Sequence, residues 1–468
     1  MGVRFVGLWI LLVAVYAATL GIPAQPGLDY AGNEPHHLLA AESLVSDRDV
    51  DLSDEYRERA YASWYPRELK TDGRLVDRRL VEPHGIGFAV LIAPAYAIGG
   101  ARAVQWQMLA MLALAFVLAA ALARRMVPEP WATVGVALVG LSPPAVAAST
   151  TITPGIAAAV LLAGAALCAL AIRERPRRRY VAGGTLLLAG LPWLGWTFLA
   201  AGVVVAWALV VWTLRERRRF AALVAGEALA GSLVFYATIN DRFYGGITPR
   251  SASTTVMPDM PFGYLERLPR LVGIWLDRDV GLLRWAPLIA LTFFAAWLLY
   301  RSRRDQLARV APARREAEAT AGLLLAVIGA QLLVVALLAA GPLRSGNAFP
   351  GVTMVAVLPA AAALAAWGLR HVPRPVGGLL ALVTLAGTAW LLWLDRSDDL
   401  RGWLAVDTHA PWGPLVVVFP DFTAATWYPI VVCVLIAVGV AVLVWRERRA
   451  AGEWRRAAAA SRTSKALH

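Results

Sequence analysis

The chain has 468 residues, of which 59% are hydrophobic, and its mean hydropathy is +0.58. This composition is too apolar for a water-soluble domain, and several apolar runs reach the ~20 residues that cross a bilayer. The net charge of +13 at pH 7 could indicate a nucleic-acid partner. The arginines, however, stand just beyond the apolar runs, where they act as topology signals. We therefore predict a multi-pass membrane protein in contact with the lipid bilayer and no nucleic acid.

Apolar runs and basic clusters together predict an all-α fold with about twelve transmembrane helices. The expected spans are 3–22, 104–123, 131–148, 155–172, 180–195, 198–214, 220–239, 284–300, 320–340, 351–369, 376–394 and 425–445. Arginines cluster at 124–125, 173–179, 215–219, 301–315 and 370–374, whereas 149–154 and 191–196 carry no Lys or Arg. The positive-inside rule then places both termini in the cytoplasm, with the chain in the cytoplasmic (inner) membrane.

This topology divides the chain into six parts. They are a first transmembrane helix (1–22), an outer loop (23–103), a transmembrane core (104–240), a second outer loop (241–283), helices with short outer loops (284–449) and a cytoplasmic tail (450–468). The apolar run 86–99 is short and contains Pro94, which favours an interfacial or re-entrant helix over a full span.

The first outer loop begins with a predicted helix. Asn33 is a suitable cap, Pro35 suits a first turn, and the helix dipole favours a carboxylate at Glu34. An apolar stripe of Leu38, Ala41, Leu44 and Val45 predicts an amphipathic helix on the membrane surface. On local signal alone, Asn33 and Glu34 would only cap this helix, and His36 and His37 would face water.

Acids, histidines and arginines gather where the outer loops meet the membrane. The candidate catalytic residues are Asp29, Asn33 and Glu34, and the candidate substrate-binding residues are His36, His37, Arg78, Arg79, Glu82, His84, Tyr244, Arg250 and Arg284. A carboxylate can take a proton from an acceptor hydroxyl while cations hold a phosphate leaving group. We therefore expect a cavity between the first outer loop and loop 240–283 to bind an anionic lipid phosphate.

No cofactor and no metal site are predicted. The acids from Asp47 to Asp51, with Glu58 beyond them, have the spacing of a calcium loop, but Leu52 stands where the sharp turn needs glycine. Cys168 and Cys433 both lie within apolar runs, so neither a disulfide framework nor a thiolate site is expected.

Several segments carry a family resemblance. The first loop contains Gly-Asn-Glu-Pro-His-His-Leu at 32–38, Trp-Tyr-Pro-Arg-Glu-Leu at 64–69 and His-Gly-Ile-Gly at 84–87. These segments resemble the first outer loop of GT-C membrane glycosyltransferases, most closely actinobacterial members, and the loop is similar to that of protein O-mannosyltransferases and lipid A aminoarabinose transferases. The resemblance continues at 141–144, 244–246, 281–287 and 349–351. It implies a first outer loop with two interfacial helices.

The resemblance also implies an activity: inverting transfer of a sugar from a polyprenyl-phosphate donor to a glycan or lipid acceptor, in cell-envelope assembly at the outer face. The expected general base of that family falls at Asn33, an amide that cannot accept a proton. Either Glu34 or Asp29 takes that role, or the chain binds lipid-linked glycan as a scaffold without turnover. Charges expected from relatives are also missing at Gly155, Thr197 and Val352. A lipid or solute transporter is a third hypothesis, but the broken central helices typical of transporters are not evident.

Overall fold

The computed structural model describes residues 2–254, 267–304, 312–338, 349, 351–397, 402–404, 418–422 and 427–466. The described elements up to residue 123 are α1 (Val3–Ala17), α2 (Glu34–Ser46), α3 (Ser53–Glu58), η1 (Ala60–Ser63), β1 (Arg74–Val76), β2 (Arg79–Val81) and α4 (Ile86–Ala123). They are followed by α5 (Trp131–Gly140), α6 (Pro143–Ser149), α7 (Pro154–Glu174), α8 (Arg178–Ala189), α9 (Leu191–Leu194), η2 (Trp196–Phe198), α10 (Leu199–Arg215), α11 (Arg219–Tyr244) and η3 (Pro249–Ala252). The later elements are α12 (Arg270–Leu276), α13 (Leu282–Trp285), η5 (Pro287–Ala290), α14 (Leu291–Arg304), α15 (Pro312–Leu333), η7 (Val334–Leu338), η8 (Val352–Val357), α16 (Leu358–His371), α17 (Arg374–Arg396) and α19 (Trp427–Ala466).

Long apolar helices form the body of the molecule. Within the described residues, eight helices are long and apolar enough to cross a membrane, and a ninth span results if α5 and α6, bent by 65°, cross as one. The chain is thus a polytopic, mainly helical membrane protein. The predicted count of twelve is not established, because α1 has only 15 residues and the expected span 180–195 is divided between α8 and α9. The predicted loop segments 255–266 and most of 341–350 and 395–424 lie outside the described residues.

Helix α4 contains a sharp bend. Gly99 and Gly100 have non-helical backbone angles, and Gly100 has φ +60° and ψ −155°, which a side chain would strain. The Gln107 side chain donates a hydrogen bond to the Leu91 carbonyl at 3.1 Å. Sixteen residues of straight helix would hold those positions roughly 24 Å apart. The segment 86–98 therefore folds back on 101–123, in keeping with the expected interfacial or re-entrant helix.

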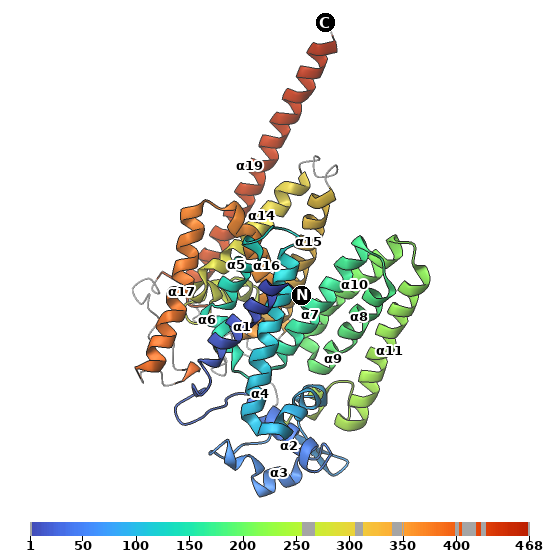
Figure 1. Ribbon diagram of the computed structural model, residues 1–468, viewed down its shortest axis with the longest axis vertical. Helices are drawn as coiled ribbons and strands as arrows, with labels where there is room; N and C mark the ends of the chain where they lie inside the picture. Colours follow the sequence, from blue (N-terminus) through green and yellow to red (C-terminus); the bar gives the residue numbers. More distant parts are fainter. Residues whose placement is uncertain are drawn as a thin grey trace.

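The basic ends of several helices meet on one side of the body. The guanidinium of Arg124 lies 5.3 Å from the centre of the Phe5 ring, so the start of α1 adjoins the end of α4. Ion pairs join Arg125 to Glu174 at 2.8 Å and Arg173 to Glu316 at 2.9 Å. The elements of the first loop, α2 and α3, lie at the opposite end of the body from the projecting end of α19 (Figure 1).

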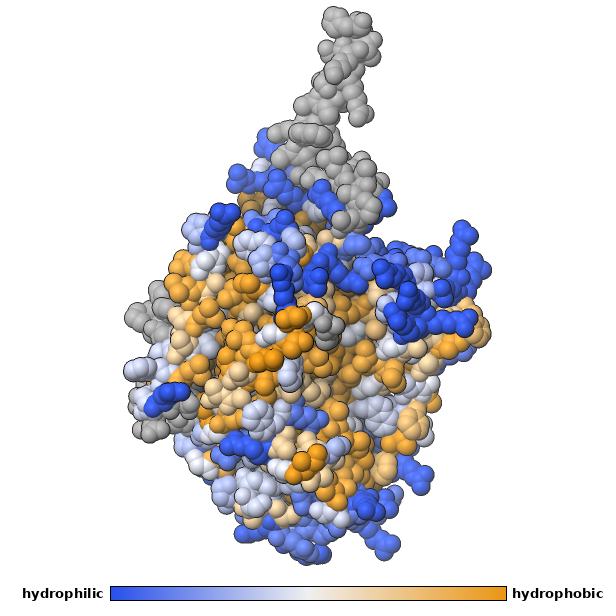
Figure 2. Space-filling view, in the orientation of Figure 1, coloured by the Kyte–Doolittle hydropathy of each residue, from blue (hydrophilic) through white to orange (hydrophobic). Residues whose placement is uncertain are grey.

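The molecular surface has the polarity of a membrane protein. Figure 2 shows a hydrophobic band across the middle of the visible face, with hydrophilic residues above and below it. Helix α11 carries several exposed apolar side chains: Phe220, Leu223, Val234 and Phe235. This distribution is the one expected of a protein whose apolar band faces lipid and whose basic ends and first loop face the polar layers.

The first loop is more compact than expected. Helix α2 was predicted to be amphipathic, yet Pro35, Leu38, Leu39, Ala41 and Ser43 are all buried. The helix is buried because it packs on two sides. Leu39 joins a small core with Tyr61 and Leu69, while Leu38 and Ala41 belong to the main core. Burial on this helix thus extends beyond the predicted apolar stripe, and its position on the membrane surface stays a prediction.

A two-stranded antiparallel hairpin, β1–β2, was not predicted in this loop. Arg74 pairs with Val81 and Val76 with Arg79. The acidic run nearby supports the hairpin: Asp51 Oδ1 accepts hydrogen bonds from the N–H of Ser53 at 3.1 Å and of Leu80 at 2.8 Å. Burial alone would raise the pKa of Asp51, but these hydrogen bonds hold it below its ordinary value.

The topology can be tested with single cysteines at the exposed positions Ser63 and Glu216, in a background in which Cys168 and Cys433 are replaced by alanine. An impermeant thiol reagent applied to intact cells is expected to label Ser63→Cys. Glu216→Cys, which stands among the arginines of 215–219, should react only after the cells are opened. If the reagent labels Glu216→Cys but not Ser63→Cys in intact cells, the predicted orientation in the membrane is wrong.

Candidate functional site

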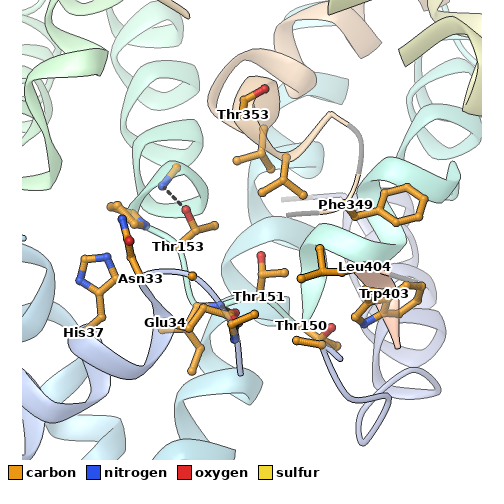
Figure 3. Close-up of a pocket in the computed structure, with 18 of the residues that line it drawn as sticks. Asn33, Glu34, His37, Thr150, Thr151, Thr153, Phe349, Thr353, Trp403 and Leu404 are labelled. Atoms are coloured by element: carbon orange, nitrogen blue, oxygen red, sulfur yellow. Dashed lines mark hydrogen bonds between the residues drawn. The ribbon is translucent and has the colours of Figure 1, made fainter. Parts of the chain in front are cut away.

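A cavity of about 410 Å³ lies where the first loop meets the helical body. Its wall combines the start of α2, the segment between α6 and α7, the start of η2 and the segment around η8. Figure 3 shows Asn33, Glu34 and His37 on one side and Phe349, Trp403 and Leu404 on the other. Thr150, Thr151 and Thr153 lie between them, so hydroxyl groups and aromatic faces share the lining. We call this space the carboxylate cavity, because Asp29 and Glu34 both border it.

Glu34 joins two distant parts of the chain. Its Oε2 accepts the N–H of Ala31 at 2.9 Å, and its Oε1 accepts the N–H of Ile152 at 2.6 Å. Burial raises the pKa of Glu34 to about 7, although both hydrogen bonds oppose that rise. The carboxyl group thus holds the turn before α2 against the segment that leads into α7, and both of its oxygens are engaged.

Asp29 and Asn33 are more accessible than Glu34. Both are exposed, and neither side chain caps a helix: the Asn33 side chain makes no capping hydrogen bond even though α2 begins directly after it. Asp29 also borders a neighbouring cavity of about 260 Å³, together with Arg102 and Gln105. Of the two carboxylates at the carboxylate cavity, Asp29 is the one that faces open space.

The four positions at which the sequence resemblance leads one to expect charge all meet in this cavity. Asn33, Gly155, Thr197 and Val352 lie far apart in the sequence, yet each lines its wall. No lysine or arginine is among the described residues of the lining. The cavity is therefore less charged than the resemblance implies, with Asp29 and Glu34 as its acidic groups.

Asn33 also lines a second cavity, of about 300 Å³. Its wall includes His84, Arg250 in η3, and the aromatic side chains Trp193, Trp196 and Tyr236. We call it the arginine cavity. It lies between the first loop and the segment after α11, the place where the sequence predicted a phosphate-binding cavity.

Three histidines pack together behind Asn33. The rings of His36 and His84 stack with centres 5.0 Å apart, and the His37 ring meets His84 edge-on at 5.3 Å. His36 Nδ1 lies 2.9 Å and 3.0 Å from the two carboxylate oxygens of Glu82, which also accepts a hydrogen bond from the Tyr56 hydroxyl. His36 and His37 are buried, so the alternative that they face water is wrong.

Burial sets the proton affinities of this cluster. It lowers the pKa of His84 to about 4, with the neighbouring His36 acting in the same direction, and it lowers the pKa of His37 as well. Burial alone would raise the pKa of Glu82, but hydrogen bonds from His36 and Tyr56 bring it below its ordinary value. The cluster thus presents neutral His37 and His84 rings beside an ionised Glu82 at neutral pH.

Other predicted residues lie away from the two cavities. Arg78 and Arg79 are exposed on the hairpin, with Arg78 in its turn. Tyr244 is buried in a small core with Val81 and Ala252. Arg284 is buried, donates a hydrogen bond to the Arg278 carbonyl, lies 3.6 Å from Asp279 Oδ1 and stacks over Trp285. In this structure Arg284 supports the wall behind Phe349, whose ring centre is 5.0 Å from that of Trp285.

Sequence reasoning missed many residues at the cavities, including the threonines of the carboxylate cavity and the aromatic side chains of the arginine cavity. Three further missed residues are charged or polar. Asp72 lines the arginine cavity, and Arg102 and Gln105 lie near Asp29. Gln105 donates to the Thr150 carbonyl at 3.3 Å and accepts from Arg102 at 3.1 Å. Arg102 and Gln105 follow the bend in α4, and only the folding back of 86–98 reveals that they face the loop.

A scan against protein-family models found no match, and a search of curated proteins found no significant relative. Among solved structures, the chain is similar to the oligosaccharyltransferase of Archaeoglobus fulgidus, with a TM-score of 0.44 and 13% sequence identity. The match covers 85% of this chain and 53% of that one, so the chain spans about half the length of that protein.

Replacing Glu34 tests its structural role. In the native protein each carboxyl oxygen of Glu34 accepts a backbone N–H. Glu34→Gln replaces one of these oxygens with an NH₂ group, which cannot accept, so one N–H loses its partner. We expect the free energy of unfolding to fall by roughly 1–3 kcal/mol. Because the pKa of Glu34 is raised in the fold, its contribution is fully present below the unfolded pKa and is lost as pH rises through about 7. The difference in thermal midpoint between wild type and Glu34→Gln should therefore shrink from pH 5 to pH 8.

Glu42→Gln, on the same helix but outside both cavities, serves as the control for this measurement. Its thermal midpoint should follow that of the wild type at each pH. If the difference in thermal midpoint between wild type and Glu34→Gln grows with pH, the pKa of Glu34 is not raised in the folded protein.

Proposed function

We propose that the protein is a polyprenyl-phosphate-sugar-dependent glycosyltransferase of the GT-C type, acting at the outer face of the cytoplasmic membrane in the assembly of cell-envelope glycan or glycolipid. One observation carries the proposal: Asn33 forms a shared wall between a cavity with a cationic side chain and a cavity with two carboxylates. A lipid-phosphate sugar donor needs a cation and a hydroxyl acceptor needs a base, and Asn33 adjoins a candidate for each, although Asp72 also lines the cavity of Arg250.

The donor phosphate is proposed to bind in the arginine cavity. The guanidinium of Arg250 can form two parallel hydrogen bonds to a phosphate, which a single ammonium group cannot do. Trp193, Trp196 and Tyr236 line the same cavity, and their rings combine an apolar face for a sugar with polar edges. A sugar attached to this phosphate would extend past Asn33, whose amide can donate to and accept from its hydroxyls.

The acceptor is proposed to enter the carboxylate cavity, where Asp29 would act as general base. A base must lie within hydrogen-bond reach of the acceptor hydroxyl, and geometry is considered before pKa. Asp29 is exposed and borders open space, whereas both oxygens of Glu34 already accept backbone hydrogen bonds. We therefore favour Asp29 over Glu34, with Asn33 positioning the hydroxyl.

A second function, binding of lipid-linked glycan without turnover, is favoured by the lining itself. Four positions at which charge is expected from relatives carry Asn33, Gly155, Thr197 and Val352, and all four border the carboxylate cavity. A scaffold would keep the phosphate-binding side chains and lose the general base. The two functions differ in one property, which is transfer.

Transfer is measured with radiolabelled polyprenyl-phosphate sugars in native membranes. We expect low native turnover and a gain in Asn33→Asp, because general-base catalysis contributes ~100- to 10,000-fold in rate. Asp29→Asn should abolish the native activity. Asp47→Asn, which removes an exposed acid of the same loop outside both cavities, should leave it unchanged.

The outcomes separate the two functions. If native protein and Asn33→Asp both bind the lipid but transfer no sugar, the scaffold function holds. If transfer is fast in the native protein, survives Asp29→Asn and is lost in Glu34→Gln, then Glu34 is the base. Failure of both forms to bind any polyprenyl-phosphate sugar would reject both functions.

A further inference from the structure

We propose that His36, Asp72 and His84 form a zinc site in the first outer loop. Each of the three offers a ligand atom, a ring nitrogen or a carboxylate oxygen, and these atoms all lie within 4.8 Å of one another. Ligands of a tetrahedral zinc ion, bound at about 2.0–2.2 Å, lie roughly 3.3 Å apart. The three side chains therefore need only small rotations to close around one ion. The proposal does not depend on sugar transfer.

The hairpin explains how the three residues meet. Asp72 stands two residues before β1, and His84 stands three residues after β2, so antiparallel pairing of Arg74 with Val81 brings these two flanks together. Gly73 permits the close approach, since a Cβ atom there would lie 2.3 Å from the Val81 carbonyl oxygen. His36, from the first turn of α2, then packs against His84.

The surroundings of His36 are those of a metal-binding histidine. Metal-bound histidines usually give their second ring nitrogen to a carboxylate, which fixes the ring and its tautomer. Here His36 Nδ1 is bound by Glu82, leaving Nε2 as the nitrogen for the ion. Glu82 is itself held by hydrogen bonds from the hydroxyls of Tyr56 and Thr71. Such support would be unnecessary for a histidine that only fills space.

His84 supplies an independent observation. Its Nε2 is buried and has no hydrogen-bond partner in the described structure. Leaving a buried polar atom without a partner is unfavourable, because the atom has lost its hydrogen bonds to water. A metal ion bound between His84, His36 and Asp72 would satisfy this nitrogen, and no described side chain does so.

The donor set selects the metal. Two imidazole nitrogens and one carboxylate oxygen suit zinc, whereas calcium and magnesium prefer oxygen ligands alone. Three protein ligands leave the fourth position open, as in zinc sites that bind water or substrate. Asp72 and His84 both line the arginine cavity, so the open position faces the space that also contains Arg250.

The main chain around the site is anchored to the second outer loop. The N–H and the hydroxyl of Thr254 both donate to the Asp72 carbonyl, at 2.9 Å and 3.1 Å. Zinc would therefore join α2, the hairpin and the segment after η3 into one unit. We expect bound zinc to raise the thermal stability of the whole protein, because a ligand that binds only the folded state stabilises it.

The test is zinc binding by full-length protein purified in detergent with an affinity tag that contains no histidine. Wild type is expected to bind one equivalent of Zn²⁺, and the ion should raise its thermal midpoint. Glu82→Gln should weaken binding ~10- to 100-fold, the usual effect of losing such an outer contact, and His84→Gln and Asp72→Asn should weaken it further. His371→Gln, which removes a histidine bound to the Trp367 carbonyl at the end of α16, should bind as wild type does.

Two results would overturn the proposal. One is absence of stoichiometric zinc in wild type. The other is zinc that persists in His84→Gln and disappears in Glu55→Gln, which would place it at the acidic group of Asp47, Asp54 and Glu55. If His84→Gln fails to fold, X-ray absorption of the zinc-loaded wild type decides: a first shell with two imidazoles supports the site, and a shell of oxygen atoms alone rejects it.

Discussion

The placement of the site depends on one buried carboxyl group. Glu34 accepts hydrogen bonds from the N–H groups of Ala31 and Ile152, residues separated by 121 positions in the chain. This pair of contacts fixes the start of α2 against the entrance to α7, and Asn33 is thereby held on the wall between the two cavities. A carboxyl group that has this structural duty is a poor candidate for proton transfer. Asp29, five residues earlier and facing open space, takes that role in our proposal.

The first loop owes its compactness to polar contacts as much as to its small apolar core. Glu82 brings His36, Tyr56 and Thr71 together, and Asp51 ties the start of α3 to β2. The hairpin between these contacts brings Asp72 to His84. Zinc binding at that point would complete a structure that hydrogen bonds have already arranged, next to the cavity where we propose that the donor phosphate binds.

The broad architecture could be predicted from sequence because its signals are local. Apolar runs predicted the long helices, the arginines predicted which helix ends share a side, and Asn33 marked the start of α2. The burial of α2 and the pairing of His36 with Glu82 could not be predicted, since both depend on segments that periodicity does not connect. Likewise, no spacing motif links His36, Asp72 and His84. Hydropathy alone predicted about twelve transmembrane helices. Helices such as α1, with 15 residues, and α9, with 4, are shorter than a full span, so hydropathy does not fix the number.

The central claim is that a lipid-linked sugar phosphate lies across Asn33, and a cryo-EM map of the protein in lipid nanodiscs with a short-chain polyprenyl-phosphate sugar tests it most directly. We predict phosphate density in the arginine cavity within hydrogen-bond distance of Arg250, and sugar density that passes Asn33 toward Asp29. Phosphate density at the opposite end of the body, against the arginines of 173–179, with both cavities empty, would contradict the account.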